Sequence, residues 1–149
     1  MSGSGDRLTE PLLAALRDGC PALLLTRGAD DYPASAFTWV VAAGPQALRF
    51  AADHGTSTLA NLQRERRASL QFIAAGGAVC LVKGAASELK PRIEASPFPM
   101  ALWQLAVEAV KDQSWPGVTV RPLGYDWAED RRARMLEMER AVYSELRRS

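Results

Sequence analysis

The sequence is poor in side chains that bind metals or form disulfides: its 149 residues include one histidine and two cysteines. A single imidazole and two separated thiols lack the ligand spacing of a zinc site. Cys20 and Cys80 both stand among apolar neighbours, so we expect reduced thiols that serve as small core residues. A Ser-His-Asp hydrolase is disfavoured too, because neither Ser57 nor Ser69 lies in a G-x-S-x-G elbow.

The sequence also lacks an excess of either charge, since 18 Lys and Arg face 17 Asp and Glu. Such a balance argues against nucleic-acid binding through a broad basic face. Two arginine clusters, at 64–67 and 131–134, have acidic neighbours and are interpreted as solvated helix faces. No run approaches the roughly 20 apolar residues of a membrane span. The first residues lack the pattern of a signal peptide, so we expect a cytoplasmic protein without membrane contact.

What the sequence does contain predicts one globular domain over residues 1–149, with residues 1–6 disordered and a C-terminal helix within 129–149. Hydrophobic periodicity and turn residues set the expected elements. Helices are expected over 7–18, 57–65, 96–112 and 129–148. Strands are expected over 21–26, 34–43, 47–52, 68–74, 78–89 and 118–127, and Gly84 within the fifth predicts a bulge or a close approach.

Most of these strands follow one another through short hairpin turns, without a regular alternation of strand and helix. That order favours a mainly β (α+β) fold, a small antiparallel barrel with helices packed outside. A Rossmann domain fits poorly, because the chain has no G-x-G-x-x-G motif.

The most informative segment is the polar turn at 54–58, His-Gly-Thr-Ser-Thr, between a predicted strand and a predicted helix. Free backbone N–H groups and the positive end of a helix dipole meet at such a turn, which favours an anion such as a cofactor phosphate. The simpler interpretation is that Thr56 or Ser57 caps the helix. His54 is interpreted either as an exposed turn residue or as a cofactor contact.

With the strands in this order, residues 8–128 resemble the pyridoxamine 5'-phosphate oxidase-like family, the FMN-binding split barrels. The resemblance rests on five motifs in register: Pro-Ala-Leu-Leu-Leu-Thr at 21–26, Pro-Ala-Ser-Ala-Phe-Thr-Trp-Val at 33–40, the turn at 54–58 with Asn-Leu at 61–62, Gly-Ala-Ala-Ser-Glu-Leu at 84–89, and Val-Arg-Pro at 120–122 with Tyr-Asp-Trp at 125–127.

The resemblance implies a six-stranded antiparallel split β-barrel with flanking helices, which forms a homodimer with two FMN sites between its subunits. By position, Ser35, Ala36, Phe37 and Thr38 would line the flavin ring, Ala52, Asp53 and His54 would border it, and Thr56, Ser57 and Thr58 would meet the phosphate. Arg121 and Trp127, on the last strand, would reach the partner's site.

The sequence departs from the family at Thr58, where a basic residue is usual, and at Ala52, where threonine is frequent. A hydroxyl bonds phosphate less strongly than a charged donor does. Arg49, Arg64, Arg66 or Lys83 could compensate from nearby.

The tryptophans at 39, 103, 115 and 127 are many for this length. They are interpreted as core and interface residues, with Trp115 or Trp127 as an alternative wall over the flavin.

Two functions remain open. The first is an FMN-dependent oxidoreductase that passes hydride between the flavin N5 and a small organic substrate other than pyridoxamine phosphate. The second is a binding protein without turnover, which holds FMN, a deazaflavin, haem or another planar ligand, or which has lost the cofactor.

Overall fold

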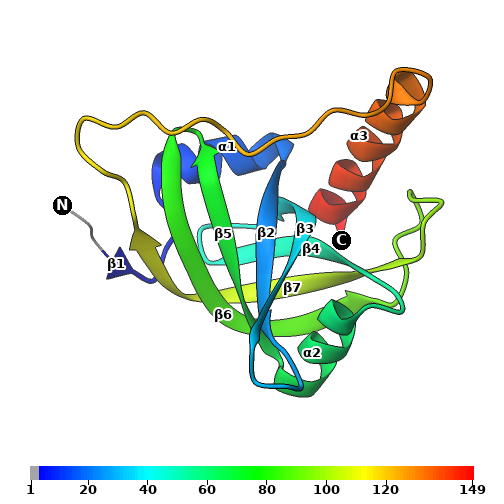
Figure 1. The fold of residues 1–149 in the computed structure, drawn as a ribbon, viewed down its shortest axis with the longest axis horizontal. Coiled ribbons are helices and arrows are strands. Elements are labelled where there is room, and N and C mark those ends of the chain that lie inside the picture. Colours follow the sequence, from blue (N-terminus) through cyan, green and yellow to red (C-terminus); the bar gives the residue numbers. More distant parts are fainter. Residues whose placement is uncertain (1–3) are drawn as a thin grey trace.

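The computed structural model describes residues 4–149 and shows a barrel of long strands with helices at its ends and on one side (Figure 1). Its elements in chain order are β1 (Ser4–Gly5), α1 (Glu10–Asp18), β2 (Cys20–Arg27), β3 (Pro33–Ala42), β4 (Ala47–Asp53), α2 (Ser57–Glu65), β5 (Arg67–Ala75), β6 (Ala78–Lys90), β7 (Met100–Asp112) and α3 (Arg132–Arg148).

Six strands close the barrel in the order β7-β4-β3-β2-β5-β6, and β6 pairs again with β7. Every pairing is antiparallel, and β1 extends the sheet beside β7. Closure gives each long strand two neighbours, so that the barrel leaves few unpaired strand edges. The predicted fold class, a mainly β six-stranded antiparallel barrel with flanking helices, is confirmed.

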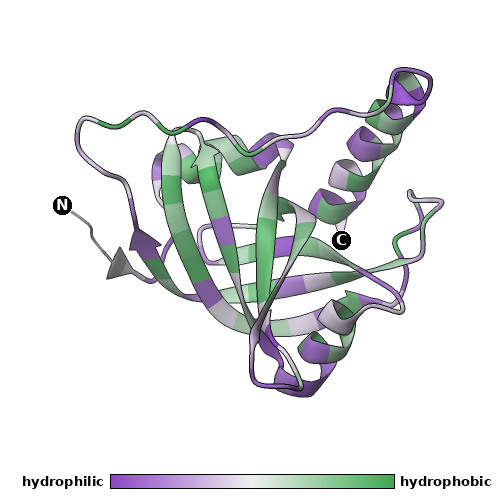
Figure 2. Ribbon diagram, in the orientation of Figure 1, coloured by the Kyte–Doolittle hydropathy of each residue, from purple (hydrophilic) through white to green (hydrophobic). Residues whose placement is uncertain are grey.

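Alternation along the strands fills the barrel interior. On β2 the buried positions are Ala22, Leu24 and Thr26, and on β5 they are Ala68, Leu70, Phe72 and Ala74. Figure 2 shows this pattern as apolar and polar bands along the strands. The period of two is that of a sheet with one face inside. The interior also takes Phe50 and Trp103, both almost wholly buried.

The three helices cover different parts of the barrel. Helix α1 buries Leu12 and Leu16 in the main core, and α2 adds Leu62 to the same cluster. Helix α3 lies outside the barrel against β3 and β4, where it builds a second apolar cluster with Val41, Ala51, Ile93, Met100 and Leu102. The α3 face in this cluster is the predicted stripe Met135, Met138, Val142 and Leu146. The residues around the β3–β4 boundary are therefore fixed from inside and from outside.

The predicted helix over 96–112 is wrong: residues 100–112 form β7, the strand that closes the barrel. Trp103, Leu105 and Val107 alternate inward along it, although Trp103, Val107 and Val110 also have helical spacing. Ala, Leu, Gln and Glu have high helix propensity, so the local sequence of this segment favours a helix. Pairing with both β4 and β6 decides the outcome, since these partners lie far away in the sequence.

The predicted strand over 118–127 is also wrong. Residues 113–127, here called the strap, form an extended segment without strand pairing, which crosses the ends of β5 and β6 on its way to α3 (Figure 1). One backbone hydrogen bond, from Leu123 N to Ile73 O at 3.1 Å, ties it to the barrel. Pro116 and Pro122 lack the N–H that a ladder requires. With β7 in place, the barrel is already closed.

The remaining predicted elements are confirmed within a few residues, and α2 matches its expected bounds. Of the segment expected to be disordered, residues 1–3 lie outside the described residues, while Ser4 and Gly5 pair with β7. Both cysteines are free thiols, as expected. Burial is the main reason that the pKa of Cys20 is raised to about 12 and that of Cys80 to about 11. The charge of a neighbouring group contributes a smaller part of each increase. No helix among residues 4–149 is long and apolar enough to span a membrane.

Candidate functional site

The candidate site lies where β3 and β4 separate. Their ladder runs from Ala42 opposite Leu48 to Val40 opposite Phe50 and then stops. Strand β4 instead continues beside β7 as far as Asp53 opposite Met100. The hydroxyl of Thr38 fills the first gap: it donates to the carbonyl of Ala51 at 2.7 Å and accepts from the Ala51 N–H at 3.2 Å. This single side chain ends the ladder without leaving Ala51 unsatisfied.

The separation leaves part of the β3 backbone facing an opening. Ala43 N donates to Ala47 O, and alternation along a strand then directs the backbone groups of odd-numbered β3 residues toward β4. At Phe37 and Trp39 the β4 ladder has already ended. Their N–H and C=O groups therefore border the opening, where a ligand with ring donors and acceptors can pair with them.

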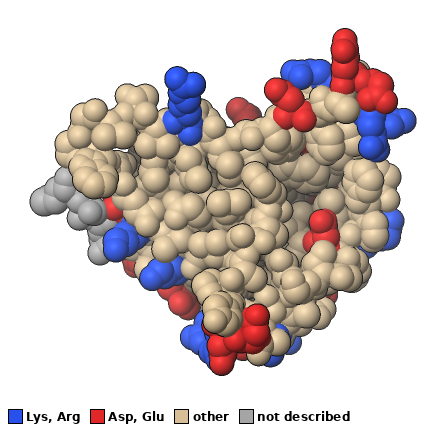
Figure 3. Space-filling model, in the orientation of Figure 1, with Lys and Arg blue, Asp and Glu red and all other residues tan. Residues whose placement is uncertain are grey.

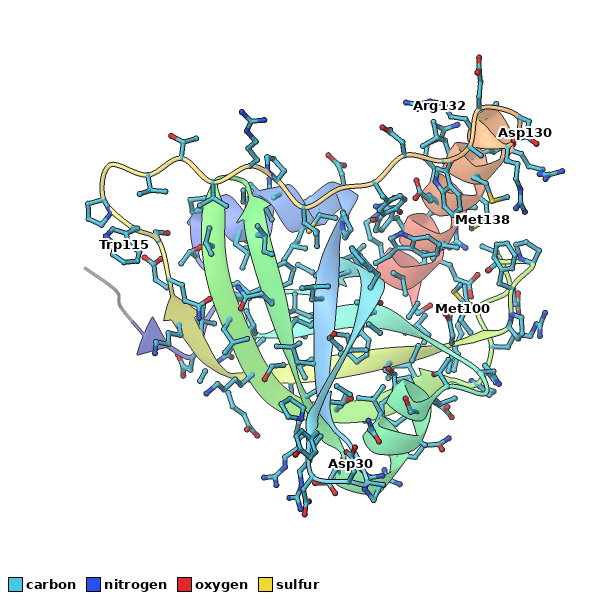
Figure 4. All side chains as sticks on the ribbon, viewed as in Figure 1. Asp30, Met100, Trp115, Asp130, Arg132 and Met138 are labelled. Carbon is cyan, nitrogen blue, oxygen red and sulfur yellow. The ribbon has the colours of Figure 1, made fainter. Side chains whose placement is uncertain are left out.

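A cavity of about 600 Å³ occupies this opening. Its walls are mostly aromatic or apolar, and its polar groups are few, as is typical of a small-molecule site. Met100, labelled in Figure 4, closes one side together with the residues that precede it on the loop after β6. The lining residues are Phe37, Thr38, Trp39, Ala51, Asp53, His54, Thr56, Phe98, Pro99, Met100, Tyr125 and Trp127.

A hydrogen-bonded cluster of aromatic residues fixes the wall that the strap contributes. Tyr125 accepts from Trp39 Nε1 and donates to a carboxylate oxygen of Glu139 on α3. Trp127 Nε1 donates to the same oxygen at 3.0 Å, and the rings of Tyr125 and Trp127 meet edge to face. Burial and the bond to Glu139 raise the pKa of Tyr125 well above its usual range. The Tyr125 side chain is therefore a neutral phenol that holds strap, α3 and β3 together.

His54 also lines the cavity and is held by two hydrogen bonds. Its backbone N–H donates to Pro99 O at 3.0 Å, and its Nε2 lies 2.6 Å from Pro91 O. A carbonyl only accepts, so Nε2 carries the proton of this bond and Nδ1 remains available. His54 is thus an exposed turn residue that also lines the cavity, and a contact with a cofactor there stays a prediction.

The polar turn delivers the start of α2 to the same cavity. Thr56 caps the helix: its hydroxyl accepts from Leu59 N at 3.3 Å and donates to Asp53 O at 2.7 Å. Ala60 N bonds Thr56 O. Ser57 and Thr58 occupy the first helical positions, whose N–H groups have no intrahelical partner. The capping interpretation is confirmed for Thr56, and two free donors remain for an anion.

The structure brings half of the predicted cofactor residues together. Phe37, Thr38, Asp53, His54, Thr56 and Trp127 line the cavity. The other six lie elsewhere: Ser35 and Ala36 are further along β3, Ala52 faces the barrel core, Ser57 and Thr58 lie beyond the rim on α2, and Arg121 is an exposed residue of the strap.

None of the four cations expected to compensate for Thr58 lines this cavity. Arg49 bonds Gln104 and the carbonyls of Leu146 and Arg147 at the end of α3. Arg64 bonds Arg27 O and Asn61 at the far end of α2, where Arg66 also lies. Lys83 lines a different depression on the outer face of β5 and β6. A phosphate beside Ser57 would consequently meet neutral donors.

Sequence reasoning missed six lining residues: Trp39, Ala51, Phe98, Pro99, Met100 and Tyr125. The incorrect prediction of a helix over 96–112 included Phe98, Pro99 and Met100, so these residues were not expected at the site. Two prolines within 97–99 are nevertheless a signal for a loop. Trp39 was assigned to packing and Tyr125 to a strand. Trp115, the other proposed wall residue, is 75% exposed and lies at the opposite end of the molecule from Met100 (Figure 4).

Comparison with solved structures supports the fold. A candidate pyridoxamine 5'-phosphate oxidase from Lactobacillus delbrueckii is 20% identical, with a TM-score of 0.57 over 71% of this chain and 94% of that one. An F420 reductase is 14% identical, with a TM-score of 0.58 over 69% and 98%. HupZ of Group A Streptococcus is 12% identical, with a TM-score of 0.59 over 78% and 99%.

No protein-family model matches the sequence, and no curated protein matches it significantly. The structural likeness establishes that this chain has the split-barrel fold of the pyridoxamine 5'-phosphate oxidase-like proteins.

Proposed function

We propose that the cavity at the β3–β4 separation binds a planar heteroaromatic cofactor, FMN in the first place, and that the protein is an FMN-dependent oxidoreductase of the pyridoxamine 5'-phosphate oxidase-like type. The observation that carries the proposal is the combination of aromatic walls with an unpaired strand edge at Phe37 and Trp39. Aromatic side chains offer flat faces to a flat ring, while backbone donors and acceptors read the polar edge of that ring.

The donor set fits the tail of FMN as well. The N–H groups of Ser57 and Thr58 and the positive end of the α2 dipole lie next to Thr56 at the cavity rim. Helix N-termini bind phosphate in this way without a cation. Neutral donors make a weaker site than charge-assisted ones, so we expect modest FMN affinity.

FMN supplies hydride transfer at its N5 when bound. The chain's own contribution is to hold the ring, exclude water and place polar groups beside it. Tyr125 is a phenol at neutral pH, fixed by Trp39 and Glu139. His54 lines the cavity, and its Nε2 is held by Pro91 O, which leaves Nδ1 without an assigned partner among residues 4–149. Nδ1 is thus the candidate acceptor for a proton from a small organic substrate.

A homodimer is part of the proposal. The outer face of β2, β5 and β6 carries the half-buried Leu23, Leu25, Ile73 and Leu81, and no helix of residues 4–149 covers them. In the view of Figure 3, the middle of this face shows few charged atoms, which lie mostly near its rim. Phe37, 62% exposed, stands opposite Leu23 and also lines the cavity. A second copy seated on this face would reach the cavity and cover it.

The alternative is a binding protein without turnover, whose planar ligand is a deazaflavin or haem in place of FMN. It is favoured by the absence of Lys and Arg from the cavity lining. One of the solved structures with this fold is an F420 reductase, which supports the deazaflavin.

Titration of the purified protein separates these functions. Binding of FMN is measured by quenching of its fluorescence, in parallel with deazaflavin and haem, and the flavin complex is then mixed with NADH or NADPH. Bleaching of the flavin band near about 450 nm supports the oxidoreductase. Binding without reduction by any donor supports the second function. No change with any of the ligands would contradict both, and sedimentation of the same sample tests the dimer.

A further inference from the structure

The cavity is unusually rich in aromatic rings, which come from β3, from the loop after β6 and from the strap. An aromatic ring is electron-rich on its face and electron-poor at its edge. Several rings around one space therefore favour a guest with a positive charge, as in the aromatic cages that bind alkylated ammonium groups. The aromatic lining residues are Phe37, Trp39, Phe98, Tyr125 and Trp127.

The polar edges of three of these rings are already paired with protein groups. Trp39 Nε1 donates to the hydroxyl of Tyr125, and that hydroxyl and Trp127 Nε1 both donate to Glu139. The planes of Tyr125 and Trp127 are inclined at 89°, and their centroids are 5.7 Å apart. A compact group in the corner between these two rings can therefore meet both, and it meets aromatic carbon, since the polar atoms are occupied.

The charged groups around the cavity are negative. Among residues 4–149, Asp53 is the one carboxylate on the lining, where no Lys or Arg lies. Its carboxylate takes part in no hydrogen bond or ion pair of the described residues, and neither does Glu139 pair with a Lys or Arg. Arg131 and Arg134 of α3 line a different depression. Two carboxylates without a counter-cation thus favour a cation in the cavity over an anion.

We propose that the cavity selects a small organic cation as substrate, whose tertiary or quaternary ammonium group lies in the corner of Tyr125 and Trp127 and is balanced by Asp53. The inference rests on the proposed function, because it adds a substrate to a flavin whose ring pairs with the β3 edge at Phe37 and Trp39. Alkylated ammonium groups suit such a corner better than a primary amine, which is strongly hydrated. A neutral molecule of the same shape would leave the Asp53 charge without a partner.

Choline and its uncharged isostere 3,3-dimethylbutan-1-ol, in which carbon replaces the ammonium nitrogen, test the preference for charge. Isothermal titration calorimetry measures both affinities, with the protein saturated with FMN and with the protein alone. We expect choline to bind about tenfold more tightly than the isostere, as cation–π contacts in a partly desolvated site allow. A cavity that is merely apolar would prefer the isostere, because the uncharged molecule has less hydration to lose. Equal affinities, or tighter binding of the isostere, would overturn the proposal.

Two variants of the lining separate the contributions of charge and ring. Asp53→Asn should weaken choline binding about three- to fivefold, the range of an exposed charge contact, and should leave the isostere within about twofold. Trp127→Leu should weaken choline binding about fivefold or more. Trp115→Leu is the matched control, because Trp115 is an exposed tryptophan of the same strap outside the cavity lining. Equal choline affinity in the wild type and both lining variants would overturn the assigned cage.

The same titrations distinguish failure of this inference from failure of the proposed function. Binding of FMN without any binding of choline would overturn the cation site and leave the flavin proposal intact. Choline binding that is abolished by FMN would overturn its assignment as the substrate class, because substrate and cofactor must occupy the cavity together. Binding of choline by a protein that does not bind FMN would contradict the proposed function, while the preference of the cavity for a cation would stand.

Discussion

Thr38 and Ala51 are joined by two hydrogen bonds through one hydroxyl, which accepts from the Ala51 N–H and donates to the Ala51 carbonyl. Both residues are buried, and both line the cavity. The pair thus substitutes for the ladder at the position where β3 and β4 separate. It keeps an opening in the barrel wall while satisfying the Ala51 backbone on the β4 side.

We therefore expect Thr38→Val to lower the free energy of unfolding by about 1–3 kcal/mol, because the isosteric side chain leaves the buried Ala51 groups unpaired. Urea denaturation measures the change, and Thr119→Val, at an exposed position of the strap, is the control. Equal losses in the two variants, or no loss at Thr38, would contradict the assigned role of the hydroxyl.

Ser57 offers a test in which stability and binding move in opposite directions. Asp is favourable in the first turn of a helix by about 0.3–1 kcal/mol, and the first turn of α2 has no acidic residue. Ser57→Asp should raise the melting temperature slightly. It should also weaken FMN binding by at least about tenfold, because the carboxylate meets the phosphate.

Riboflavin, which has no phosphate, provides the comparison and should bind the Ser57→Asp protein as it binds the wild type. A basic residue is better placed at Ser57 than at Thr58, because Ser57 is exposed whereas Thr58 is 7% exposed. Ser57→Arg should accordingly tighten FMN binding. If Asp and Arg at this position gave the same FMN affinity, the phosphate would lie elsewhere.

Glu145 supports the loop that forms one side of the cavity, and its effect on stability should depend on pH. Its buried carboxylate accepts from Glu94 N, Ala95 N and Lys90 Nζ. Burial raises the pKa of Glu145, but these bonds outweigh it and leave the pKa below the ordinary value of 4.5. The charged form is thus favoured by folding. Its stabilisation is complete above the unfolded-state pKa and is lost as pH falls through the lowered folded-state pKa.

Glu145→Gln should cost about 1–3 kcal/mol at pH 7, and the gap from the wild type should narrow below about pH 4. Chemical denaturation at several pH values measures both, with Glu108→Gln on an exposed part of β7 as control. A gap that is constant with pH would show that the Glu145 charge is not what holds the loop.

The sequence predicts those elements of this structure that neighbouring residues determine, and it fails for those that depend on pairing with distant strands. Helix α2 is local: Thr56 caps it, and Leu59 and Leu62 form its buried face, so its bounds follow from neighbouring residues. Residues 100–112 have apolar side chains at both helical and strand spacing, and only their pairing with β4 and β6 selects the strand. Closure of the barrel thus decides between helix and strand, and closure depends on residues that lie far apart in the sequence.

The candidate site follows the same division. His54 and Thr56 belong to a turn whose composition is distinctive, and with Asp53 before it they line the cavity, while their contact with a cofactor stays a prediction. Tyr125 and Trp127 reach it because the strap crosses the molecule and α3 presents Glu139 to both. Arg121, six residues before Trp127, lies outside the lining. An extended segment has no internal period, so its sequence does not indicate where it lies.

Gly84 provides a final test of the barrel itself. It stands at the irregularity in the β6–β7 ladder, where Lys83 pairs with Ala109 and Gly84 with Val107. A Cβ at Gly84 would overlap the backbone carbonyl oxygen of Ala106, an atom held within the same pairing. We expect Gly84→Ala to lower the free energy of unfolding by about 1–3 kcal/mol, because β7 must shift to admit the methyl group.

The matched control is Gly124→Ala in the strap, where a Cβ would meet no atom within 4 Å. That change should be neutral or stabilising by up to about 1 kcal/mol, since it restricts the unfolded chain at a site without strain. Midpoints and slopes of urea denaturation distinguish the two variants. If Gly84→Ala were as well tolerated as Gly124→Ala, the close approach of β6 to β7 would not be needed for closure. The glycine within this strand would then not indicate a bulge or a close approach that the fold requires.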